Sequence, residues 1–199
     1  RLDIDEVALL LDEVEQGEKL TDKQKSYHQK TKVRDLALLT LLLGTGIRVS
    51  ECVGLNIADI DFKNGGIRIY RKGGKEVTVY FGTEVEDALL DYLEERDRII
   101  PEKGHEDALF LSLQRRRMAV RSVENLVKKY ARIVSPLKPI TPHKLRSTYG
   151  TNLYRETGDI YLVADVLGHS DVNTTKRHYA ALEDERRRSA RNKVRLREK

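Results

Sequence analysis

Cysteine, proline and aromatic residues are scarce in this sequence. Among 199 residues there are one cysteine, four prolines, three phenylalanines and no tryptophan. With Cys52 alone, the chain cannot form an internal disulfide framework or a cysteine-based metal cluster. We expect a reducing, intracellular compartment.

Long apolar runs are also missing. The longest candidate is "LALLTLLL" at residues 36–43, far short of the roughly 20 apolar residues that a membrane span needs. No signal peptide opens the sequence. We therefore expect a cytoplasmic protein with no membrane contact. Its length fits one large domain, or one domain with extensions.

The net charge of +5 is concentrated near the C-terminus. Residues 176–199 hold ten Lys/Arg and four Asp/Glu, a net of +6, whereas residues 1–175 hold 27 basic and 28 acidic residues, a net of −1. A solvated helix is the simplest interpretation of such a run. The alternative is contact with a polyanion or with an acidic patch on a partner.

The hydrophobic periodicity is mostly helical. "GGIRIYRKGGKEVTVYF" at 65–81 instead alternates apolar and polar residues on both sides of Gly73-Gly74, which predicts a β-hairpin with those glycines at its tip. "ALFLSL" at 108–113 fits a short strand or a loop. Thr141 and Asn173 are the expected caps of two late helices. Helical spacing is found in these ranges: 5–16, 21–46, 48–55, 84–100, 122–134, 141–157, 159–167 and 171–188.

Polar residues stand out first in a glycine-rich stretch and in the hairpin. Arg48 follows Gly44 and Gly46, so its guanidinium could clamp a phosphate, or it could simply cap a helix or pair with Glu51. Lys72 lies in the predicted hairpin turn. It is either an ordinary exposed lysine or a proton donor carried into a substrate groove.

Two further motifs follow along the chain. His143 and Arg146 share one face near the start of a helix, where the helix dipole favours bound anions, although such pairs are also often structural. His169 follows a helix-ending glycine, and its simplest role is to satisfy local backbone groups. Tyr179, ten residues later, is either a core aromatic or a reactive phenol.

Three segments together resemble a known family. "TGIRVSECVGL" (45–55), "PHKLRSTYGTNL" (142–153) and "VLGHSDVNTTKRHY" (166–179) are similar to signature segments of the tyrosine recombinase, or phage integrase, family. The likeness covers about residues 33–182. Within the family it looks closest to the Xer branch, and there to XerS-type recombinases.

The resemblance implies a role for each polar residue. Arg48 and Arg146 would hold the nonbridging oxygens of the scissile phosphate and His169 would donate a hydrogen bond to it. His143 would accept the phenolic proton, and Tyr179 would become joined to the DNA 3′ phosphate. The leaving 5′ oxygen would be protonated by the hairpin lysine, Lys72, with Lys75 as its rival. Residues expected to contact DNA are Arg71, Lys75, Thr141 and Lys144.

One departure from the family pattern concerns the nucleophile. In Xer proteins the tyrosine usually falls nine residues after the histidine that matches His169. Here that position holds His178, and Tyr179 is one residue further, as in many phage-type integrases. No other tyrosine follows His169, so Tyr179 is kept. No metal or other cofactor is expected, because the sequence has neither a carboxylate cluster nor a P-loop.

The resemblance also implies an architecture. We expect an α+β fold, mostly helical with a small antiparallel sheet or hairpin. Residues 1–30 would be the end of an interdomain connector and the first helix, 31–182 the catalytic domain, and 183–199 a basic C-terminal tail. The family's N-terminal core-binding domain has no counterpart in this chain.

Its expected partners are double-stranded DNA and copies of itself, as a tetramer on two DNA sites joined by exchange of C-terminal tails. The expected activity is site-specific recombination that resolves chromosome dimers. The alternatives are a phage or transposon integrase, a type IB topoisomerase-like activity, and a non-catalytic DNA-binding regulator on the same scaffold.

Overall fold

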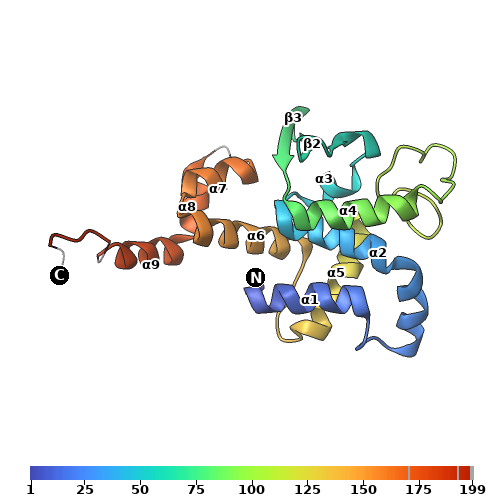
Figure 1. Cartoon of the computed structure of the whole chain (residues 1–199), viewed down its shortest axis with the longest axis horizontal. Helices are drawn as coiled ribbons and strands as arrows, with labels where there is room; N and C mark the ends of the chain where they lie inside the picture. Colours follow the sequence, from blue (N-terminus) through green and yellow to red (C-terminus); the bar gives the residue numbers. More distant parts are fainter. Residues whose placement is uncertain (170, 192, 198–199) are drawn as a thin grey trace. The chain divides into compact units, whose positions relative to one another are not determined.

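The computed structural model describes residues 1–169, 171–191 and 193–197. The chain forms two compact units, Arg1–Tyr149 and Gly150–Lys199, and the boundary falls within one helix, α6 (Pro142–Thr157). Each unit is described by itself (Figure 1). In the described residues no helix combines the length and the apolar character needed to cross a bilayer.

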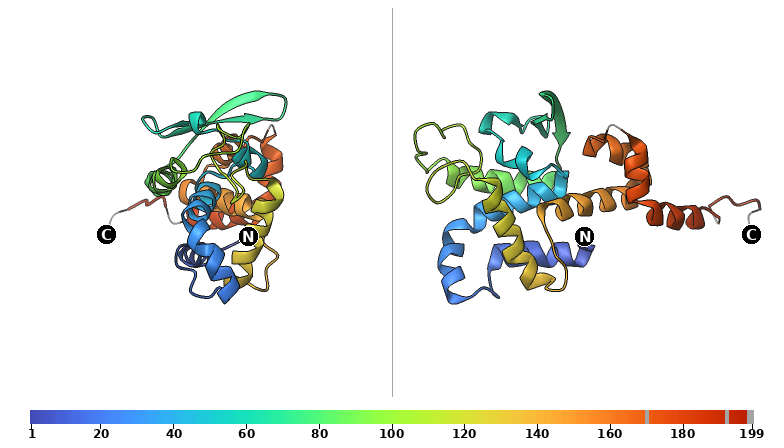
Figure 2. Two further views of the ribbon diagram at one scale, coloured as in Figure 1. Left: turned by 90° about the vertical axis from the view of Figure 1, so that its right-hand side faces the viewer. Right: turned by 180° about the vertical axis from the view of Figure 1, so that it is seen from behind.

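The first unit combines helices with one small sheet, which lies to one side of the helices in Figures 1 and 2. The sheet is antiparallel in the order β1-β2-β3. The two long strands pair Ile67 with Val79 and Ile69 with Val77, so the predicted hairpin is confirmed. The strand β1 was not predicted, because two residues are too short to show alternation. The elements of this unit before α6 are α1 (Ile4–Gln16), α2 (Asp22–Thr45), α3 (Val49–Val53), a 3₁₀ turn (Ile57–Asp59), β1 (Ile60–Asp61), β2 (Gly66–Arg71), β3 (Lys75–Tyr80), α4 (Thr83–Arg96) and α5 (Val120–Val134).

Local capping chemistry fixes the ends of the first two helices. Asp3 caps α1 and forms a reciprocal capping box with Glu6, so the helix begins one residue before the predicted Asp5. Both α1 and α2 end on a glycine in the left-handed conformation, Gly17 (φ 67°) and Gly46 (φ 71°). The second half of α2 is buried almost all round, which explains its continuous apolar run.

The chain between α4 and α5 forms neither a helix nor a named strand. Within "ALFLSL", Ala108 and Leu111 make only isolated antiparallel bridges, to Asn56 and Arg117. Residues 108–111 are nonetheless buried. Of the two predictions for this run, the loop is therefore the better one, and its apolar side chains complete the core beside α4.

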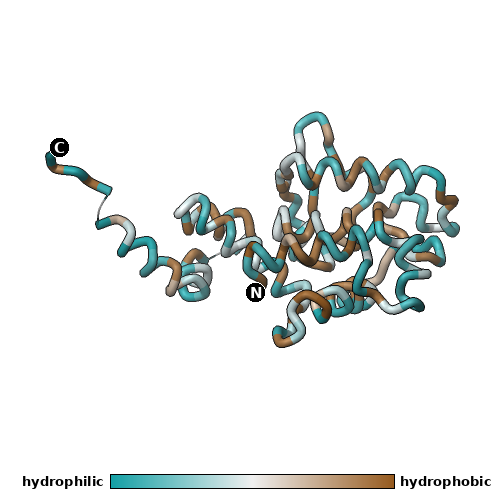
Figure 3. The backbone as a smooth tube through the Cα atoms, turned by 60° about the horizontal axis from the view of Figure 1, so that its bottom comes forward, coloured by the Kyte–Doolittle hydropathy of each residue, from teal (hydrophilic) through white to brown (hydrophobic). Residues whose placement is uncertain are grey.

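The second unit contains the end of α6, then α7 (Ile160–Leu167), α8 (Val172–His178) and α9 (Ala180–Ala190). The prediction that Asn173 caps the next helix is wrong. Asp171 is the cap, and its carboxylate accepts a hydrogen bond from the backbone N–H of Asn173 at 2.9 Å. The single helix predicted over 171–188 is also wrong, because it breaks at Tyr179 (φ −112°, ψ 22°). Toward the C-terminus the chain is mainly hydrophilic (Figure 3).

Candidate active site

Arg48 is the N-cap residue of α3 and is tied to Glu51. One Glu51 oxygen accepts from the backbone N–H of Arg48 at 2.8 Å, and the other lies 3.3 Å from the Arg48 guanidinium. That second oxygen also lies 3.3 Å from Nε of Arg71, on β2. The Glu51 side chain is 5% exposed, whereas that of Arg48 is 45% exposed. A buried carboxylate therefore orients an arginine that remains open to solvent and able to meet an anion.

Arg146 lies against the loop that carries Arg48. Its guanidinium donates to the carbonyl oxygen of Gly46, 100 residues away in sequence, and the residue is 6% exposed. Gly46 also faces the ring of Tyr149, since a Cβ added there would come 2.3 Å from Tyr149 Cδ1. The first turns of α6 thus pack directly onto the glycine turn after α2. This packing brings Arg146 close to Gly46, which lies two positions before Arg48.

The N-terminal turn of α6 presents its polar residues to solvent. His143, Lys144 and Thr141 are exposed. Thr141 accepts a weak hydrogen bond, 3.4 Å, from the backbone N–H of Lys144, and α6 begins at Pro142, as expected. His143 and Arg146 therefore stand near a helix N-terminus, one exposed and the other anchored, in an arrangement suited to an anionic group.

The hairpin turn carries both candidate lysines. The last cross-strand pair is Arg71 with Lys75, so Lys72, Gly73 and Gly74 form the turn. Both glycines have positive φ, 83° and 76°, and a Cβ added to either would meet nothing within 4 Å. The turn is therefore open, and Lys72 and Lys75 are both exposed.

In the second unit, His169 is fixed by local contacts. Gly168 ends α7 in the left-handed conformation, and the His169 backbone N–H donates to the carbonyl of Ala164 at 2.9 Å. The ring Nδ1 shares a hydrogen bond with the hydroxyl of Thr175, which is fully buried. This contact fixes one nitrogen of the imidazole and so the orientation of the ring.

Tyr179 is a packed aromatic side chain of the second unit. The residue is 2% exposed, and its ring meets that of Tyr154 edge-on, with centroids 6.2 Å apart. A Cβ added to Gly150 would come 2.1 Å from the Tyr179 hydroxyl oxygen, so the phenol occupies space that only glycine leaves free. Its packing matches the simpler expectation of a core aromatic, and its role as a nucleophile stays a prediction.

The comparisons with known proteins decide the family. A family model described as "Phage integrase family" matches residues 1–186, nearly the whole chain. The chain belongs to the phage integrase family. Among curated relatives, tyrosine recombinase XerS of Streptococcus uberis is 37% identical over 188 residues, which cover 92% of this chain and 52% of the relative. Tyrosine recombinase XerD of Oceanobacillus iheyensis is 38% identical over 148 residues, which cover 74% of this chain and 50% of the relative. The chain spans about half the length of these relatives.

Solved structures confirm the fold. A crystal structure of XerA recombinase has a TM-score of 0.78 and 28% identity, covering 97% of this chain and 65% of that one. XerH in a post-cleavage complex with its palindromic difH substrate has a TM-score of 0.77, covering 96% of this chain and 52% of that one. At 24% identity it supports the fold alone. The expected α+β fold, mainly helical with a small antiparallel sheet, is confirmed, as is membership of this integrase family.

Two contacts of this phage integrase family member could not be read from its sequence. Glu51 was expected as a partner of Arg48, but Arg71, 20 residues further on, was not expected to share the same carboxylate. Nothing in the sequence indicated that Gly150 would lie beside the phenol of Tyr179. Both contacts join elements whose relative positions depend on tertiary packing.

Proposed function

We propose that the protein is a site-specific DNA recombinase that cleaves and rejoins DNA through a covalent 3′-phosphotyrosine intermediate. The observation that carries the proposal is the contact between Arg146 and Gly46, which brings an arginine of α6 to the loop of Arg48. Arg48 and Arg146 would together bind the nonbridging oxygens of one phosphodiester. A helix N-terminus bearing His143 would complete the anion site in the first unit.

The chemistry requires these residue types. A phosphodiester is anionic and resists nucleophiles, and a tyrosine with a pKa near 10 is mostly neutral at pH 7. Arg48 and Arg146 would neutralise the phosphate and stabilise charge that develops in the transition state. Loss of one such donor typically lowers the rate on the order of 10²–10³-fold. His143 would accept the phenolic proton, and Lys72 would protonate the departing 5′ oxygen.

The second unit would supply His169 and the nucleophile. His169 would donate a hydrogen bond to the phosphate, with its ring oriented by Thr175. Tyr179 would attack phosphorus, so that the bond from phosphorus to the 5′ oxygen breaks and a phosphotyrosine bond forms. Since Tyr179 is 2% exposed, its hydroxyl has to be uncovered before attack. We propose that DNA binding accompanies this change.

The biological setting is proposed from the relatives. Identity to XerS of 37% over 92% of the chain favours an Xer role in the cytoplasm, with resolution of chromosome dimers, over a phage or transposon integrase.

The partners would be double-stranded DNA, at Arg71, Lys75, Thr141 and Lys144, and further copies of the chain in a tetramer joined through C-terminal tails. Residues 31–182 would form the catalytic domain and 183–199 a basic tail.

The decisive experiment is covalent capture. The protein is incubated with a pool of nicked suicide duplexes that share a randomised core, and complexes that resist denaturant are isolated and sequenced. Wild type should yield a protein–DNA adduct on enriched sequences, and Tyr179→Phe should yield none, because only the hydroxyl is removed. An adduct that survives Tyr179→Phe but is lost in His178→Ala would show that the nucleophile is misassigned. DNA binding with no adduct in any form would favour the regulator.

A further inference from the structure

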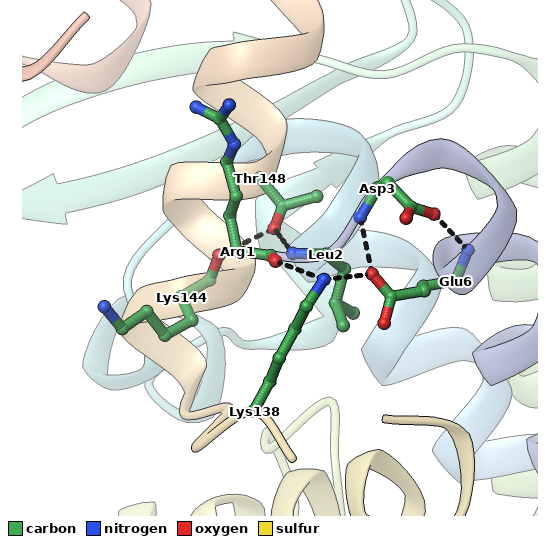
Figure 4. Close-up of polar contacts among 7 residues, drawn as sticks. All are labelled: Arg1, Leu2, Asp3, Glu6, Lys138, Lys144 and Thr148. Carbon is green, nitrogen blue, oxygen red and sulfur yellow. Dashed lines mark hydrogen bonds and ion pairs between the residues drawn. The ribbon is translucent and has the colours of Figure 1, made fainter. Parts of the chain in front are cut away.

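The segment that leads into α1 fastens the first unit's part of α6 (Figure 4). The backbone N–H of Leu2 donates to the hydroxyl of Thr148 at 3.0 Å, and that hydroxyl donates to the carbonyl of Lys144 at 2.8 Å. Leu2 and Thr148 are only 2% and 1% exposed. One threonine hydroxyl can donate once while accepting, so it satisfies a buried backbone donor and a helix carbonyl together.

A second contact holds the loop that enters α6. The Glu6 carboxylate binds the ammonium of Lys138, which also donates to the carbonyl of Arg1 at 3.4 Å (Figure 4). Hydrogen bonds from Lys138 and Ser135 lower the pKa of Glu6 to about 2, so the carboxylate is charged at neutral pH. Residues 1–6, here called the strap, therefore hold both the approach to α6 and its second turn.

The part of α6 under the strap is the part that carries the proposed chemistry. The Lys144 carbonyl that Thr148 contacts lies between His143 and Arg146 on the helix. Arg146 is anchored separately, to the carbonyl of Gly46. The helix is thus held from two sides, by the glycine turn and by the strap. Misplacement of a reacting group by about 1 Å can lower a rate on the order of 10²-fold.

We propose that the strap, acting through Thr148, positions His143 and Arg146 for the cleavage step. Thr148 is a positioning residue, since its hydroxyl is buried and occupied by Leu2 and Lys144. The inference rests on the proposed function. It adds that residues at the start of the chain, far in sequence from the α6 residues, set the rate of strand cleavage without setting DNA affinity.

The test compares three threonine variants on the captured duplex. Thr148→Val keeps the side-chain shape but removes the hydroxyl, and Thr148→Ser restores it. Thr157→Val is the matched control. The Thr157 hydroxyl also donates to a carbonyl of the same helix, that of Leu153 at 2.8 Å, and accepts from a backbone N–H, that of Asp159 at 3.2 Å, without contact to the strap. The measurements are the single-turnover rate of adduct formation, the equilibrium DNA affinity and the thermal unfolding curve.

The proposal predicts that loss of the strap contact lowers the cleavage rate without lowering the DNA affinity. Thr148→Val should form the adduct on the order of 10²-fold more slowly, at unchanged DNA affinity. Thr148→Ser and Thr157→Val should stay within about threefold of wild type. Lys138→Met opens the strap at a side chain that is 42% exposed, so it should fold even if Thr148→Val does not. It should also lower the cleavage rate by a larger factor than it lowers the DNA affinity.

Several outcomes would overturn the proposal. They are a wild-type cleavage rate in Thr148→Val, an equal loss of rate in Thr157→Val, or a loss of rate matched by a loss of DNA affinity. If Thr148→Val is unfolded, a wild-type cleavage rate in Lys138→Met overturns it instead. A wild-type protein that forms no adduct would overturn the proposed function itself, which separates that failure from a failure of the strap.

Discussion

At the scale of single residues, the tightest constraint on the proposed nucleophile is a glycine. Gly150 lies in the middle of α6, although glycine has a low helix propensity. The Tyr179 hydroxyl fills the space that a side chain at this position would take. The ring is held further by Tyr154. The position of the phenol therefore depends on the absence of one methyl group.

Gly150→Ala should destabilise the protein. Alanine gains about 0.5–1 kcal/mol in helix propensity. The added Cβ would approach the Tyr179 hydroxyl to 2.1 Å and Leu167 Cδ1 to 3.1 Å, and overpacking of a buried site costs about 1–3 kcal/mol. The cost of overpacking should exceed the gain in helix propensity. Urea denaturation should therefore give a lower free energy of unfolding, and Tyr179 should be more exposed. Gly82→Ala, where nothing lies within 4 Å, is the control. A Gly150→Ala variant more stable than wild type would contradict this packing.

At the scale of elements, the hairpin shows how far local sequence determines structure. Its two strands followed from alternation and its turn from two glycines, both of which are local signals. The break at Tyr179 was not predictable in this way, because residues 171–188 keep a helical pattern through it. Tertiary packing of one ring overrides that pattern. Likewise, the motifs supplied the candidate site residues, but not the contact of Glu51 with Arg71 or that of Thr148 with Leu2.

The hairpin also carries a prediction about the general acid. Lys72 lies in the open turn, whereas Lys75 belongs to the last cross-strand pair. Lys72→Met should slow cleavage by roughly 10²–10⁴-fold, the usual contribution of a positioned acid. The rate should recover on DNA whose bridging 5′ oxygen is replaced by sulfur, since a thiol with a pKa near 8.5 leaves without a proton donor.

Lys75→Met is the matched variant for that experiment. It removes the same charge from the same hairpin, and at saturating DNA, where a lost DNA contact does not limit the rate, it should slow the cleavage step by less than about threefold on either DNA. The measurement is the single-turnover cleavage rate of both variants on oxygen- and sulfur-bridged duplexes. Sulfur rescue of Lys75→Met instead of Lys72→Met would transfer the role of acid to Lys75.

At the scale of the whole molecule, charge is distributed unevenly along the chain. The first 175 residues are nearly neutral, and the positive excess follows them. Within α9, two arginines are paired four residues apart, Arg187 with Glu183 at 3.7 Å and Arg188 with Asp184 at 3.1 Å. Residues 191–197 contain four basic residues and no acidic one. This last stretch therefore has the strongest local positive charge to offer a polyanion.

The salt dependence of DNA binding should reveal whether that stretch contacts phosphates. Each neutralised phosphate contributes about 0.9 to the slope of log affinity against log salt, so losing four contacts should flatten the slope by about 3–4. The variant changes four residues to glutamine, Arg191, Lys193, Arg195 and Arg197. The control makes the same charge change at exposed lysines of the first unit, Lys19, Lys23, Lys25 and Lys30, and should leave the slope unchanged. If instead the tail variant keeps the wild-type slope but no longer assembles into tetramers on paired sites, the basic tail docks on a neighbouring subunit and does not bind DNA.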